Sequence, residues 1–143
     1  MKIIKALCLS LLVLVPGSLT FAQQRSPAYI HALEDLQSAR WMLEHRPVNG
    51  KQSGDEIQAV KQIDGAIKDI QKASIDGRME PKVYATDAKS DSTRRLHEAV
   101  SFLRKAKADI TKVEDKSTLK GLRHRAWKHI DDAIKLTEKA MKA

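Results

Sequence analysis

Apolar residues recur at intervals of three and four along four stretches of the chain, and no stretch alternates apolar and polar residues over the length of a strand. This spacing places apolar side chains on one face of a helix, so the sequence predicts an all-α protein. The four stretches are expected to form two antiparallel αα-hairpins, over about residues 26–77 and about residues 92–142. Residues 78–91 contain a proline and mixed charges without an apolar face, and they are interpreted as the linker between the hairpins.

Capping residues and prolines predict where the helices begin and end. Ser26 precedes a proline and favours the start of the first helix, and Pro47 ends that helix. Ser53 and Glu56 have the spacing of a capping box at the start of the second helix. The fourth helix is expected to begin at about Ser117, after a turn short enough to make the third and fourth helices antiparallel neighbours.

The chain contains an internal repeat. The segment QAVKQIDGAIKDIQKA, which begins at Gln58, matches RAWKHIDDAIKLTEKA, which begins at Arg125, at nine of sixteen positions with an offset of 67 residues. The same offset places the first predicted helix over the third. Two helix pairs that share one offset indicate a duplicated hairpin, whereas chance similarity of amphipathic helices would explain only one pair. We expect the two hairpins to bury each other's apolar faces in a single four-helix bundle over residues 23–143.

Residues 1–22 have the three-part pattern of a secretory signal peptide, with Lys2 and Lys5 before an apolar run over residues 6–15. The run is too short for a retained membrane anchor, which needs about 18 or more apolar residues. Cleavage after this segment removes Cys8, the only cysteine, so we expect neither a disulfide nor a thiolate ligand in the mature domain. The sequence therefore predicts a periplasmic or secreted protein with no transmembrane segment after cleavage.

Three segments, HALEDLQSARWMLEHRP, IDGAIKDIQKASIDG and GLRHRAWKHIDDAIK, resemble a family of small exported bacterial all-α proteins. Members of this family show similar ALxDLxxAR and IDxAIxxI segments. The resemblance extends from His31 to Ile134, which is most of the chain after residue 22. It implies a secreted or periplasmic bundle with a duplicated helical hairpin. It implies no activity, because the family offers no catalytic residues to transfer.

Charge is distributed unevenly along the chain, which holds 26 Lys and Arg against 18 Asp and Glu. Residues 23–77 sum to −1, whereas residues 92–143 sum to +7. On the last predicted helix, five basic residues lie opposite the apolar stripe and form the predicted binding surface: Arg125, Lys128, Lys135, Lys139 and Lys142. Such a surface can bind anionic lipid headgroups, cell-wall polymers or an acidic protein. The alternative is a solvated helix face that keeps the protein soluble.

Two pairs of charged residues coincide under the 67-residue offset. Arg40 aligns with Lys107, and Asp64 aligns with Asp131. All four positions fall within or near the predicted apolar stripes. The favoured interpretation is that the alkyl stems of Arg40 and Lys107 pack on the core while their charges reach water. The alternative is a polar contact or anion site between the hairpins, because a buried charge needs a partner.

Histidines offer an alternative function. If successive helices ran alternately up and down, His45, His124 and His129 would lie at one end of the bundle, where side chains of facing helices can bind a metal or haem. However, His124 and His129 are five residues apart, and ligands on one helix face are three or four apart. Surface histidines are therefore the favoured interpretation.

The sequence lacks the motifs of common enzyme classes. It has no nucleophile elbow, no phosphate-binding loop and no paired acid and base in a glycine-rich loop, so we predict neither enzymatic activity nor a cofactor. Nucleic acid is not an expected partner, because no aromatic residues alternate with the basic ones. The sequence predicts a non-enzymatic exported bundle that binds a partner protein or an envelope component through its helix faces, with the metal- or haem-binding bundle as the alternative.

Overall fold

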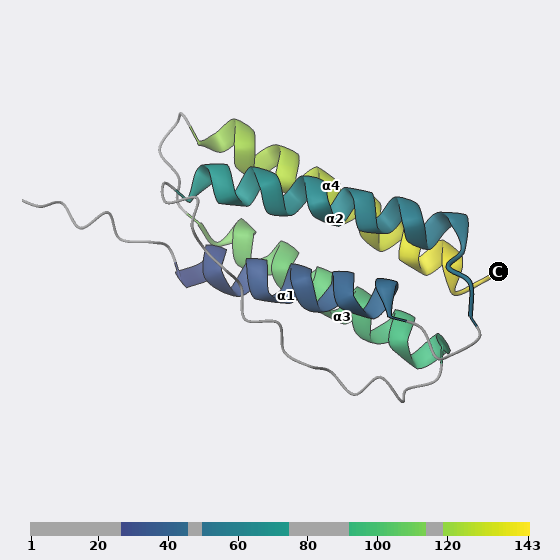
Figure 1. Ribbon diagram of the computed structural model, residues 1–143. Helices are drawn as coiled ribbons and strands as arrows, with labels where there is room; N and C mark the ends of the chain where they lie inside the picture. Colours follow the sequence, from purple (N-terminus) through teal and green to yellow (C-terminus); the bar gives the residue numbers. More distant parts are fainter. Residues whose placement is uncertain (1–26, 46–49, 75–91, 114–118) are drawn as a thin grey trace, which may run out of the picture.

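The computed structural model of the chain describes residues 27–45, 50–74, 92–113 and 119–143. These residues form four helices and no strand, as Figure 1 shows: α1 (Pro27–Glu44), α2 (Gly54–Ala73), α3 (Ser92–Thr111) and α4 (Lys120–Ala140). The predicted all-α class and the four helices are confirmed. The predicted signal peptide and linker lie outside the described residues.

No helix within these ranges combines the length and the apolar content that a membrane span requires.

The start of α2 is capped as the sequence predicts. The Glu56 backbone N–H donates to Ser53 Oγ at 3.2 Å, and the Ser53 backbone N–H donates to Glu56 Oε2 at 2.7 Å. This capping box satisfies two donors at the helix start that would otherwise have no partner in the helix. By contrast, α4 begins at Lys120, and the N-cap residue Leu119 makes no side-chain capping hydrogen bond. The predicted start at Ser117 lies outside the described residues.

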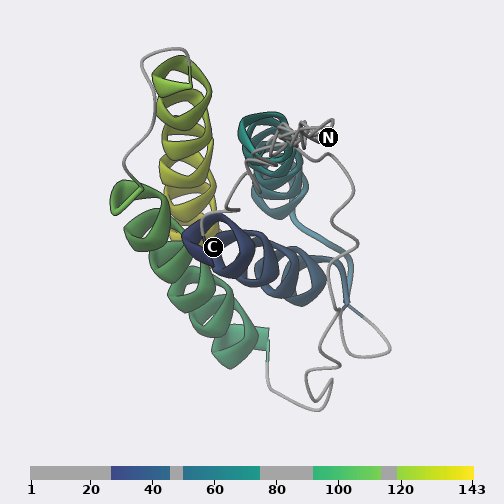
Figure 2. The same ribbon diagram turned by 90° about the vertical axis from the view of Figure 1, so that its left-hand side faces the viewer.

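Each helix packs against two antiparallel neighbours. The most extensive contacts join α2 to α4 and α1 to α3, and smaller contacts join α3 to α4 and α1 to α2. Within the described helices, α1 does not contact α4, and α2 does not contact α3. In Figure 2, α4 accordingly stands beside α2, and α3 crosses beside α1.

Ion pairs and hydrogen bonds between helix ends show in which direction each helix runs. Lys139, near the end of α4, binds Asp55 at the start of α2. The Arg95 side chain, at the start of α3, donates to the backbone carbonyl of Met42 near the end of α1. Arg95 also pairs with Glu56 at the start of α2, so α2 and α3 run in the same direction, opposite to α1 and α4, as the ribbon in Figure 1 also shows. The chain therefore does not run alternately up and down.

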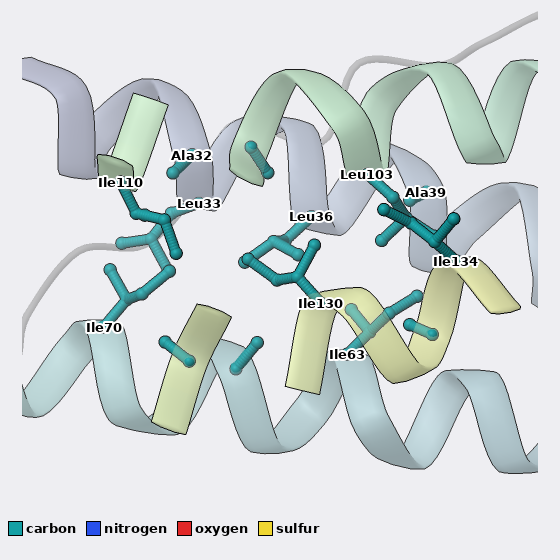
Figure 3. Packing of buried hydrophobic residues seen from close by; sticks show 14 of the residues in the cluster. Ala32, Leu33, Leu36, Ala39, Ile63, Ile70, Leu103, Ile110, Ile130 and Ile134 are labelled. Carbon is teal, nitrogen blue, oxygen red and sulfur yellow. The ribbon is translucent and has the colours of Figure 1, made fainter. Parts of the chain in front are cut away.

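Aliphatic side chains from all four helices fill the space between them. Figure 3 shows many of these side chains directed into the bundle. Burial of each large aliphatic side chain stabilises the fold by roughly 1.5–3 kcal/mol before entropy is counted. Alanines with no exposed surface let α2 approach α4 closely. They are Ala59 and Ala66 on α2 and Ala126 and Ala133 on α4, which are equivalent pairs under the 67-residue offset.

A buried ion pair joins three helices at one end of the bundle. Arg95 Nη2 lies 3.2 Å from Glu56 Oε1, and the two side chains are 2% and 0% exposed. Arg95 Nη1 also donates to the backbone carbonyls of Met42 and His45. One guanidinium thus binds the last turn of α1 and the first turn of α2 to the start of α3. Sequence analysis did not single out Arg95.

Candidate functional site

The predicted basic surface of α4 is partly neutralised by acidic residues of α2. Arg125 Nε lies 3.3 Å from Asp69 Oδ2, and Lys139 Nζ lies 2.9 Å from Asp55 Oδ1. Asp69 is buried, and it also accepts from Arg125 Nη2 at 3.4 Å. These two basic residues of the predicted surface therefore hold α4 against α2.

A third basic residue of this surface forms an ion pair within α4. Lys135 Nζ lies 2.7 Å from Asp131 Oδ2, and Lys107 Nζ of α3 lies 2.5 Å from Asp131 Oδ1. The hydrogen bonds from Lys107 and then from Lys135 lower the pKa of Asp131, and the hydrogen bond to Asp131 raises the pKa of Lys135. Of the two remaining predicted residues, Lys128 is exposed, and Lys142 lines a hollow between α3 and α4.

The predicted polar contacts of Arg40 and Lys107 form, but between helices that follow each other in the chain. Arg40 Nε of α1 lies 2.9 Å from Asp64 Oδ1 of α2, and the equivalent Lys107–Asp131 pair joins α3 to α4. The alternative of contacts between the two hairpins at these positions is therefore wrong. These positions lie at the edge of the core, where antiparallel sequence neighbours meet, so each charge pairs within its own half.

The structure does not bring the three predicted histidine ligands together. His45 follows the end of α1, where its ring stacks on Trp41 with 4.5 Å between ring centroids. His124 lies in the first turn of α4, at the opposite end of the bundle, and His129 lies farther along the same helix. A shared histidine end would require successive helices to alternate in direction. Because α2 and α3 run in the same direction, the three histidines do not lie at one end of the bundle. No group of three His, Cys, Asp or Glu in the described residues could hold a metal.

His129 instead packs in the contact between α2 and α4. Its Nδ1 lies 2.7 Å from Gln62 Oε1, and its Nε2 lies 3.9 Å from Asp69 Oδ2. A Cβ atom at Gly65 would approach the His129 ring to 3.1 Å, so the glycine makes room for the imidazole. Gln62 and His129 are equivalent under the 67-residue offset, and the two equivalent side chains touch each other.

A hollow of about 830 Å³ opens between α3 and the end of α4. Its apolar residues are Val100, Ala108 and Met141. Basic residues from both helices surround them, and the acidic lining residue, Glu138, lies 2.7 Å from Arg104 Nη2. The basic residues and the remaining polar lining are His97, Ser101, Arg104, Lys105 and Lys142.

A second hollow of about 470 Å³ lies between the end of α3 and the start of α4. Trp127 lines it with 38% of its surface exposed, and Lys107 Nζ lies 4.0 Å from the centroid of the Trp127 ring. Arg123 also lines this hollow, and its guanidinium donates to the backbone carbonyl of Val113. The other lining residues are Ile110, Thr111, Lys120 and His124.

The basic residues of α3 are the part of the site that sequence analysis missed. Arg104 and Lys105 were not included in the predicted surface, because that surface was drawn on α4 alone. The charge sum of +7 over residues 92–143 includes both helices, and it is the feature that could have indicated a shared face.

Comparison of the chain with family models, with curated proteins and with solved structures finds no match.

Proposed function

We propose that the protein is a non-enzymatic, exported binding protein that attaches to an anionic component of the cell envelope through the face formed by α3 and α4. One observation supports this proposal above the others. The two hollows between these helices are lined by five Lys and Arg, and a single acidic residue, Glu138, is among their described lining residues.

The distribution of acidic partners favours binding over a merely solvated face. On the side of α4 that faces α2, Asp55 and Asp69 neutralise the basic residues. In the hollow at the end of α4, neither Lys105 nor Lys142 forms an ion pair with an acidic residue of the described ranges, although Arg104 pairs with Glu138. Charges of one sign around a concave, partly apolar surface strengthen the local field and attract anions.

Export is proposed from the signal-peptide pattern of residues 1–22 and from the resemblance to small exported bacterial bundles. Production of the full chain in a bacterial host should yield a periplasmic or secreted protein that begins at Gln23. N-terminal sequencing of the fractionated protein checks this expectation. An intact leader in the cytoplasmic fraction would contradict it.

We also propose that the two halves descend from one duplicated hairpin. The equivalent ion pairs Arg40–Asp64 and Lys107–Asp131 support the duplication, because each joins the two helices of its own half with the same polarity. Contact between the equivalent residues Gln62 and His129 supports it as well.

Sedimentation with vesicles tests the proposed function. The protein should bind phosphatidylcholine vesicles that contain phosphatidylglycerol, and it should not bind pure phosphatidylcholine vesicles. Binding should weaken as salt rises, because the Debye length falls from about 30 Å at 0.01 M to about 10 Å at 0.1 M ionic strength. Reversal of two hollow charges, Lys105→Glu with Lys142→Glu, should weaken binding at low salt by at least about tenfold, since each Lys near such a surface contributes ~1 kcal/mol.

The control changes the net charge by the same amount on another helix. Lys61→Glu with Lys68→Glu alters two exposed residues of α2. This variant should retain most of its binding. Equal weakening by the two variants would show that net charge alone attracts the protein, and it would contradict a specific role for the α3–α4 face.

A further inference from the structure

We infer that the 830 Å³ hollow between α3 and the end of α4 binds an amphiphile with one apolar chain and one anionic head group. The inference rests on the proposed function and names the class of ligand that the α3–α4 face selects. A free amphiphile and a lipid within a bilayer share this chemistry.

The apolar part of the hollow continues the hydrophobic core to the surface. Val100 is 5% exposed and belongs to the core, and Met141 is partly buried and packs against it. On the exposed side of α3, the lining residues Ser101 and Ala108 are small, which leaves space above this apolar surface. A methylene chain placed there would remove apolar surface from water. The unbranched thioether of Met141 can adapt to chains of different shape.

The rim of the hollow provides the positive charge that an anionic head group requires. Lys105 lies on α3 and Lys142 lies two residues after the end of α4, so the rim receives a cation from each side of the hollow. Arg104 adds a third cation, although Glu138 neutralises it in part through an ion pair whose side chains are 66% and 36% exposed. Three cations against one carboxylate favour an anionic head group over a neutral or cationic one.

Apolar surface and charge lie within the same hollow, and this combination decides between ligand classes. A small inorganic anion would use only the rim and would leave Ala108 and Met141 in contact with water. A neutral amphiphile would cover these residues but would leave the lysines without a partner. An anionic amphiphile is the class that uses both parts of the hollow.

Calorimetric titration of the purified protein with laurate below its micelle concentration tests the inference. Laurate should bind in a saturable manner at one site. Inorganic phosphate and dodecyl maltoside, which represent the head charge alone and a neutral amphiphile, should bind at least about tenfold more weakly, a difference of ~1.4 kcal/mol. Affinity should also rise from decanoate to laurate, by up to about fourfold for each methylene that enters the hollow.

Variants that fill the hollow without changing charge separate chain binding from surface attraction. Ser101→Phe and Ala108→Phe each place a ring in the hollow at an exposed position of α3. Either should lower laurate affinity by at least about tenfold, and circular dichroism establishes that the variant is folded. Gln58→Phe is the matched control, because it places the same ring at an exposed position of α2 and should leave laurate affinity unchanged.

The outcomes separate this inference from the proposed function. Laurate affinity that is unchanged in both folded filling variants, or no laurate binding at all, would overturn the inference. If the charge-reversal variant still lost vesicle binding in that case, the proposed function would stand. If laurate binds and Ser101→Phe also weakens binding to phosphatidylglycerol vesicles, the inference is supported and the source of the ligand is the bilayer. If laurate binds and Ser101→Phe leaves vesicle binding unchanged, the inference is supported and the ligand is a free amphiphile.

Discussion

Arg95 connects three chain segments through one buried guanidinium. Its partners are the Glu56 carboxylate and backbone carbonyls at the end of α1. Because Glu56 also belongs to the α2 capping box, loss of Arg95 would leave a buried carboxylate with fewer compensating donors and would disturb a helix start. A buried ion pair can contribute little relative to an apolar replacement, but removal of one partner is strongly destabilising.

Replacement of this arginine gives the first prediction at the residue scale. Arg95→Ala should lower the free energy of unfolding by ~3–5 kcal/mol, because it leaves a buried charge without its partner. Urea denaturation followed by circular dichroism measures the change. The neighbouring Arg94→Ala is the control, since the Arg94 side chain is 75% exposed and its ion pair within the described ranges is with Glu98 one turn away, an arrangement that contributes about 0.3–0.5 kcal/mol. Similar losses in the two variants would contradict a structural role for the Arg95 ion pair.

The Asp35 carboxyl costs the folded protein stability when it is ionised. Burial raises the pKa of its carboxyl above the ordinary value of 3.8, and the charge of Lys105 opposes this shift only in part. A carboxyl whose pKa is higher in the folded state binds a proton more tightly there than in the unfolded chain. Its ionisation therefore costs stability as the pH rises through this pKa, and the cost persists at neutral pH.

Asp35→Asn should therefore stabilise the protein at neutral pH, and the gain should disappear as the pH falls below about 4, where the native carboxyl is protonated in both states. Thermal unfolding of the two proteins across this pH range measures the difference. Asp132→Asn removes the same charge from α4 and is the control for the change in net charge. A gain that does not change with pH would show that another property of the substitution causes it.

At the scale of the helices, the close contact between α2 and α4 depends on a small residue opposite a large one. Gly65 lies in the interior of α2, where alanine would favour the helix by about 0.8–1 kcal/mol. The added Cβ would lie 3.1 Å from the His129 ring, which is tighter than ordinary van der Waals contact. Because His129 is fixed by Gln62, the ring cannot move without the loss of that contact.

A double-mutant cycle tests this coupling. Gly65→Ala should stabilise the His129→Ala variant by up to about 1 kcal/mol, because the ring is absent and only helix propensity acts. In the native background the same substitution should stabilise less or destabilise. The free energy of unfolding of the four proteins gives the interaction term. An equal effect in the two backgrounds would contradict the contact between Gly65 and His129.

The sequence predicted the helices well because their causes are local. The three-and-four spacing of apolar residues identified all four, and Ser53 with Glu56 predicted the capping box that starts α2. The direction of α3 was not predictable in this way. The residues from Ser74 to Ser92 can span more than about 50 Å, whereas a helix of α2's length spans about 30 Å, so α3 could begin at either end.

The candidate site was predicted only in part, because it depends on which helices become neighbours. Helix periodicity placed Lys128 on the exposed side of α4, as the structure has it, whereas Lys142 is exposed just after the end of the helix. It could not show that Asp55 and Asp69 would neutralise two other basic residues of that side. It also could not show that Lys105 of α3 would face the same hollow as Lys142.

At the scale of the whole molecule, the equivalent helices of the two halves make the main contacts. Contacts between α1 and α3 and between α2 and α4 exceed those within either half. An isolated half would therefore expose most of the apolar surface that the intact bundle buries. Short isolated helices are only marginally stable in water, because packing supplies most of their stability.

This arrangement predicts that neither half folds alone and that the two halves fold together. A peptide of residues 23–77 and a peptide of residues 78–143 should each show much less helix by circular dichroism than the intact protein. An equimolar mixture should regain helix and elute as a heterodimer in size-exclusion chromatography, because the α1–α3 and α2–α4 contacts form between the peptides. Arg95→Ala in the second peptide should weaken this association, since Arg95 binds Glu56 and Met42 of the first. Halves that are fully helical alone, and that do not associate when mixed, would show that each hairpin has a sufficient core of its own.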